Sequence, residues 1–131
     1  MITELFPIST LKSLISHHIA LIDRQDAYYS QEFALVFLKM EDFDNLEIKK
    51  SIQIVFRDSD IIFNMEENYI ILLPKTNWNS AHELLSGLQE FLDQEFKDSI
   101  VTFPDDAKEV HGLLDSFKNV VKKCYDIELT L

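Results

Sequence analysis

The chain has 131 residues, of which 47% are hydrophobic, so it is long enough to form one domain around a single core. Its 23 acidic and 12 basic residues give a net charge of -11, which repels nucleic-acid backbones and anionic membranes and makes both poor partners. One cysteine, Cys124, excludes an internal disulfide and favours a reducing compartment. Because Glu4 stands where a signal peptide would be basic and no apolar run approaches ~20 residues, we expect a cytoplasmic protein.

The first quarter of the chain predicts a helix followed by a buried strand. Between Ile8 and Ile22, apolar residues recur at spacings of three and four, which is typical of an amphipathic helix. The run FALVFL, Phe33 to Leu38, is continuously apolar and predicts a strand inside a sheet. We therefore expect an N-terminal helix within residues 1–29 and the remaining core of the single domain, 1–131, within residues 33–131.

A β-hairpin is predicted from Arg57 to Pro74, RDSDIIFNMEENYIILLP, after a shorter helical pattern at 43–56. Two apolar runs, 61–63 and 69–73, flank a polar group at 64–68 that suits a turn. The second run is apolar at every position, which predicts a central strand covered on both faces. Pro74 ends it, because proline cannot donate a hydrogen bond to a neighbouring strand.

The C-terminal half predicts two more helices and two more strands. Thr76 or Asn77 can cap a helix. The apolar residues expected on its inner face are Trp78, Ala81, Leu84, Leu85, Leu88, Leu92 and Phe96. A strand is predicted at 99–103, a helix at 110–124 and, from the alternating tail 125–131, a half-buried strand. The order contains a β-α-β-β-α-β core, so we predict an α+β, ferredoxin-like antiparallel sheet with packed helices.

Several kinds of site are excluded by the residues present. The two glycines, Gly87 and Gly112, lie inside helical patterns, so no phosphate-binding glycine loop can be built. The four histidines lack the spacing of metal ligands, and Cys124 lies on an apolar helical stripe, where a packed side chain is expected rather than a nucleophile. We therefore expect no cofactor, no metal site and no hydrolase chemistry.

The hairpin resembles the signature of the GGDEF domains, the diguanylate cyclases, which reads R-x-x-D, five residues, G-G-D/E-E-F and an apolar strand ending in Pro. Alignment on Pro74 puts five residues at the signature positions, with one residue missing before them and both glycines replaced: Met65, Glu66, Glu67, Asn68 and Tyr69. Residues 7–26, 33–43, 76–92 and 100–107 resemble other elements of that family. The resemblance covers most of the chain and implies a palm-like fold with a degenerate signature.

Cyclase activity, as the resemblance implies it, would need carboxylates that hold metal ions against a triphosphate. The family has an aspartate at the position of Lys39 and an acidic residue at that of Glu67. Lys39 is a cation, Met65 and Glu66 replace the glycines that let substrate approach the backbone, and the guanine-recognising segment before the hairpin is shortened. We therefore expect no catalysis and, instead of the metal site, an ion pair between Lys39 and Glu67 worth at most about 1 kcal/mol.

Arg57 and Asp60 match the R-x-x-D motif of the family's inhibitory site for cyclic di-GMP. A guanidinium can bind a phosphate or a guanine edge bidentately, and a carboxylate can accept from guanine nitrogens. The same two residues equally fit a structural pair at the C-terminal end of a helix.

Three functions therefore stay open. The first is an inactive GGDEF-like domain of bacterial signalling, a regulatory or protein-interaction module whose acidic surface faces a basic partner. The second is a cyclic di-GMP receptor that binds through Arg57 and Asp60. The third is a residual nucleotide enzyme.

Overall fold

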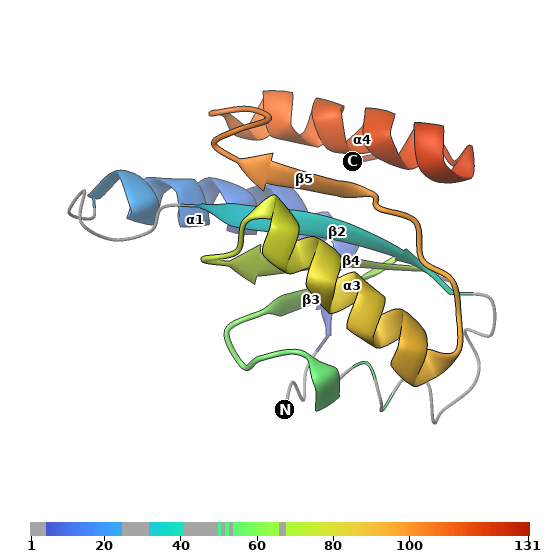
Figure 1. The fold of residues 1–131 in the computed structure, drawn as a ribbon. Coiled ribbons are helices and arrows are strands. Elements are labelled where there is room, and N and C mark those ends of the chain that lie inside the picture. The colour runs from blue at the N-terminus through green and yellow to red at the C-terminus, as the bar shows by residue number, and fades with distance from the viewer. Residues whose placement is uncertain (1–4, 25–31, 41–49, 51, 53, 66–67) are drawn as a thin grey trace.

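The computed structural model describes residues 5–24, 32–40, 50, 52, 54–65 and 68–131 (Figure 1). In chain order, the elements are β1 (Phe6–Pro7), the short 3-10 helix η1 (Ile8–Thr10), α1 (Leu11–Arg24), β2 (Phe33–Lys39), β3 (Ile61–Met65), β4 (Asn68–Pro74), α3 (Trp78–Leu92), β5 (Ile100–Phe103) and α4 (Val110–Tyr125). Lys50, Ile52, Ile54 and Val55, from the predicted helical pattern at 43–56, are helical as well, and the rest of that pattern up to residue 49 lies outside the described residues.

Five strands form one sheet in the order β1-β3-β4-β2-β5. The pairs β3–β4, β4–β2 and β2–β5 are antiparallel, which is the strand arrangement of the predicted ferredoxin-like fold. The runs FALVFL and YIILLP are neighbouring inner strands, as their continuous apolar character predicted. One feature differs from the predicted antiparallel sheet: β1 adds a parallel edge to β3, and its two residues are too few to show a period in the sequence.

The sheet is buried on both faces, each by its own core. Ala34, Val36 and Leu38 of β2 belong to the core on the α3 face, which also contains Ala81, Leu85 and Leu88 of that helix. Phe33, Leu35 and Phe37 alternate with them and belong to the second core, together with the inner faces of α1 and α4. Figure 1 shows α3 on one side of the sheet and α1 on the other. None of the helices among the described residues is long and apolar enough to cross a membrane.

The hairpin has longer strands than the sequence predicted. β3 continues to Met65 and β4 begins at Asn68, and these two residues pair with each other. The polar residues Asn64 and Asn68 therefore belong to the strands rather than to the turn, because each pairs across the ladder. Only positions 66 and 67 separate the strands, and they lie outside the described residues.

The predicted strand at 125–131 is wrong. Helix α4 runs to Tyr125 and ends at Asp126, whose φ of 56° is left-handed, and no strand follows. The alternation in the tail has another origin: Leu129 is buried, and Ile127 and Leu131 pack beside it on the core of the α1 and α4 face. Alternating side chains thus cover a core without any ladder of backbone hydrogen bonds.

Helix α3 begins as predicted but turns one aromatic residue outward. The Asn77 side chain caps the helix by accepting a hydrogen bond from the Ser80 N–H at 2.8 Å. Trp78 was expected on the inner face, yet it is 41% exposed and stacks on His82 with ring centroids 5.2 Å apart. The ring of His82 in turn hydrogen-bonds to Asp98 at 2.7 Å. Trp78 therefore packs against His82 on the surface and not, as the sequence had predicted, against the core.

Candidate functional site

The residues singled out in the sequence lie at two opposite ends of one strand pair. β2 and β4 pair along their whole length, so that Phe33 lies opposite Pro74 at one end and Lys39 lies opposite Asn68 at the other. Because each strand rises by about 3.3 Å per residue, the two ends are about 20 Å apart. Arg57 and Asp60 belong to the Pro74 end, whereas Lys39 and the signature positions belong to the Asn68 end.

At the Pro74 end, the Arg57 side chain donates hydrogen bonds to three other residues. Its Nη2 donates to Asp60 Oδ1 at 2.9 Å, to the Pro74 carbonyl at 3.0 Å and to Thr76 Oγ1 at 3.1 Å. Its Nε donates to Asp60 Oδ1 at 3.2 Å, and the Arg57 backbone N–H donates to Asp60 Oδ2 at 2.9 Å. We call this group, Arg57, Asp60, Pro74 and Thr76, the arginine clamp. It ties the entry of β3 to the exit of β4.

The two charged members of the arginine clamp differ sharply in exposure. The Asp60 side chain is 2% exposed, while that of Arg57 is 56% exposed. A buried carboxylate is stable only when its charge and lone pairs are matched, and here Arg57 matches both. The pair therefore serves the structure, which is one of the two roles that the sequence left open. Any ligand role falls to the exposed guanidinium, because both Asp60 oxygens already accept from Arg57.

At the Asn68 end, the described signature residues take part in the packing of the hairpin. Met65 packs on the core of the α1 and α4 face, and the Asn68 side chain accepts a hydrogen bond from the Met40 N–H at 3.3 Å. Tyr69 is 2% exposed, and burial raises the pKa of its hydroxyl. Glu66 and Glu67 lie outside the described residues, and so does the predicted ion pair between Lys39 and Glu67.

Lys39 is exposed and lies near the end of α4. Its Nζ is 6.0 Å from the ring centroid of Tyr125, and its carbonyl accepts from the Gln94 side chain at 2.8 Å. The sequence did not predict Tyr125 or Gln94 as site residues, because only the fold brings them into contact with Lys39. The one signal was that Tyr125 directly follows the last apolar position of the predicted helix.

Comparisons with known proteins extend this picture. No family model matches the sequence, and no curated protein matches it. Among solved structures, the GGDEF domain of TpbB (YfiN) from Pseudomonas aeruginosa superposes with a TM-score of 0.68 and 14% identity, covering 92% of this chain and 87% of that one. The fold is that of a GGDEF domain. A sensory box/GGDEF family protein from Caulobacter crescentus has the same TM-score and identity, with 93% and 94% covered.

The GGDEF-like fold agrees with the resemblance seen in the sequence, at an identity of 14% to either structure. Both comparisons cover nearly the whole chain, so the helices and the sheet match together rather than the hairpin alone. The likeness establishes the architecture.

The arginine clamp makes a prediction about stability. Arg57→Ala should lower the free energy of unfolding by about 2 kcal/mol, because the buried Asp60 carboxylate keeps only its backbone donor. Arg24→Ala, at the only other arginine, should cost less than about 1 kcal/mol, since Arg24 is exposed at the last turn of α1. Urea denaturation measures both. Equal, small effects of the two substitutions would contradict a structural role for the clamp.

Proposed function

We propose that this GGDEF-like domain is catalytically inactive and acts in bacterial signalling, in the cytoplasm, as a regulatory module that binds a protein. The observation that carries the proposal is the position of Lys39. It is the last residue of β2 and lies opposite Asn68, beside the hairpin tip. The sequence resemblance places a metal-binding aspartate there, and an ammonium at that point repels a divalent cation instead of binding it.

The packing at the hairpin tip supports the same proposal. A cyclase would need open backbone at the first two signature positions, so that substrate phosphates could approach it. Met65 occupies the first of these positions. Its side chain packs on the core of the α1 and α4 face, and its backbone pairs with Asn68. The second position is Glu66, whose charge repels phosphates.

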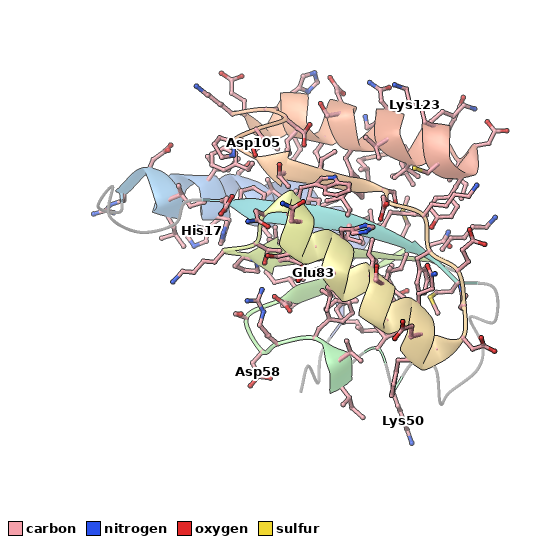
Figure 2. The ribbon with its side chains drawn as sticks, in the orientation of Figure 1. His17, Lys50, Asp58, Glu83, Asp105 and Lys123 are labelled. Carbon is pink, nitrogen blue, oxygen red and sulfur yellow. The ribbon has the colours of Figure 1, made fainter. Side chains whose placement is uncertain are left out.

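The acidic character of α3 indicates what kind of partner the domain would bind. From Trp78 to Phe96 the chain has no lysine or arginine, and Glu83 and Glu90 are exposed on the helix. Figure 2 shows Glu83 on the side of α3 that is turned away from the sheet. Phe91 is 63% exposed next to Glu90. Carboxylates beside an exposed aromatic ring suit a basic protein surface, because complementary charge speeds and orients association while the ring supplies apolar contact.

The proposal predicts that the protein does not synthesise cyclic di-GMP. Incubation with GTP and either magnesium or manganese should yield no product detectable by chromatography, even at high protein concentration. An active diguanylate cyclase in the same buffer is the positive control. Product that accumulates in proportion to this protein would contradict the proposal.

A second candidate function is the binding of cyclic di-GMP, and the exposure of Arg57 favours it. Slightly more than half of the Arg57 side chain is open to solvent, at 56%, so a phosphodiester could reach the guanidinium. Asp60 would contribute through Arg57, which it holds in place, and not by accepting from a guanine edge. The carboxylate is buried and already bonded.

Calorimetric titration distinguishes the two functions. If cyclic di-GMP binds, Arg57→Lys should weaken binding by about 1.5 to 3 kcal/mol, because a lysine keeps the charge but loses the bidentate geometry. Arg24→Lys is the matched control and should bind like the wild type. The absence of heat and of any thermal shift with wild-type protein at high micromolar ligand would end the receptor hypothesis.

A further inference from the structure

Three side chains form a connected group on the surface at the beginning of α3. The Trp78 ring stacks on the His82 ring with centroids 5.2 Å apart and the ring planes 9° from parallel. The His82 Nδ1 hydrogen-bonds to Asp98 Oδ1 at 2.7 Å, which joins α3 to the segment before β5. We call this group, Trp78, His82 and Asp98, the tryptophan stack. All three side chains belong to the part of the chain that the structure describes.

Each member of the tryptophan stack holds the next one in place. The Asp98 carboxylate orients the imidazole of His82 through their hydrogen bond, and the oriented imidazole gives Trp78 a flat surface on which to lie. His82 covers one face of the indole, so the part of Trp78 that stays exposed, 41%, lies mainly on the other face and the ring edge. A partner would meet an aromatic surface that is already ordered, which lowers the entropic cost of binding.

The charge beside the tryptophan stack is negative. The Asp98 side chain is 42% exposed, so its carboxylate attracts cations from the solvent next to the rings. Lys97, its neighbour in the chain, points to the opposite face of the sheet, where its Nζ lies 5.6 Å from the ring centroid of Tyr125. Glu83 directly follows His82 and is turned away from the sheet (Figure 2). The acidic outer side of α3 therefore borders the stack.

We propose that the tryptophan stack anchors an arginine side chain of the protein partner, with the guanidinium lying on the open face of the Trp78 ring. This inference rests on the proposed function, because it names the side chain by which a basic protein would be recognised. Tryptophan attracts cations more strongly than the other aromatic rings, and the planar, weakly hydrated guanidinium stacks on a ring better than a lysine ammonium does. The Asp98 carboxylate attracts the same cation.

Fluorescence titration of the full chain with two peptides tests this anchor. The probes are hexa-arginine and hexa-lysine with blocked ends, at constant ionic strength and about pH 8, where imidazole side chains are ordinarily neutral. Trp78 is the only tryptophan in the chain, so its emission reports contact at the stack. Hexa-arginine should change the emission saturably and at lower concentration than hexa-lysine. No saturable change with hexa-arginine, or the same curve with both peptides, would overturn the proposal.

Substitutions separate the tryptophan stack from the general acidity of the protein. In calorimetric titrations, Trp78→Ala should weaken hexa-arginine binding about fivefold, the loss expected for one exposed cation–π contact, and hexa-lysine binding less. Asp98→Asn keeps an acceptor for His82 but removes the charge. It should weaken hexa-arginine more than Asp105→Asn does, the same change at an exposed aspartate between β5 and α4. Equal losses for both peptides with Trp78→Ala would overturn the anchor.

Failure of the anchor and failure of the proposed function have different results. In capture from extracts of the native cell, Trp78→Ala should retain less of the basic partner than the wild type does. A partner retained equally by both forms would overturn the anchor and leave the protein-contact function standing. Binding of hexa-arginine that depends on Trp78, in a domain that captures no partner, would support the anchor and contradict the proposed function.

Discussion

The pairing of β2 with β4 is the contact on which the rest of the molecule depends. Seven residues of each strand pair in register, from Phe33 with Pro74 to Lys39 with Asn68. Both strands have neighbours on either side, and side chains of both enter the two cores. A shift of one residue in this register would exchange the two faces of the strand and place Lys39 on the wrong side of the sheet. Because both strands are apolar on both faces, the hydrophobic pattern alone does not fix this register, and the packing of individual side chains in the two cores has to hold it.

The same pairing separates two groups of polar residues that have different physical roles. At the Pro74 end, the arginine clamp neutralises a buried carboxylate and fastens the hairpin. Arg57 therefore has a structural role whether or not it also binds a ligand. At the Lys39 end, two lysines remain near one tyrosine ring and have no carboxylate partner among the described residues. In the first arrangement the opposite charges of Arg57 and Asp60 are paired with each other, and in the second the two ammonium groups lie beside an aromatic ring.

Features that depend on local pattern were predictable from the sequence. The inner strands, the helices α1, α3 and α4 and the Asn77 cap all follow from apolar spacing and capping residues that act over a few positions. The ferredoxin-like order followed from the sequence of these elements. The shared resemblance to GGDEF domains was likewise visible in the hairpin, and the comparison with solved structures confirms the fold.

Features that depend on contacts between distant residues were not predictable. The tail 125–131 has the alternation of a strand, yet its apolar side chains pack on the core between the sheet and helices α1 and α4 instead of pairing with a strand. The arginine clamp includes Thr76 and Pro74, which only the hairpin brings near Arg57. Lys97 and Tyr125 are 28 residues apart and join Lys39 through the fold alone. The spacing of residue types along the sequence does not predict contacts between residues this far apart.

The central claim, that the domain works through protein contact on its acidic α3 face, is tested most directly by capture from extracts of the native cell. The wild-type domain should retain a basic protein that is released as salt rises toward about 0.5 M, where charge attraction is strongly screened. The variant Glu83→Gln/Glu90→Gln should lose that protein, whereas Asp105→Asn/Glu109→Gln, with the same charge change in the segment between β5 and α4, should keep it. Capture of the same protein by all three forms, unaffected by salt, would contradict the claim.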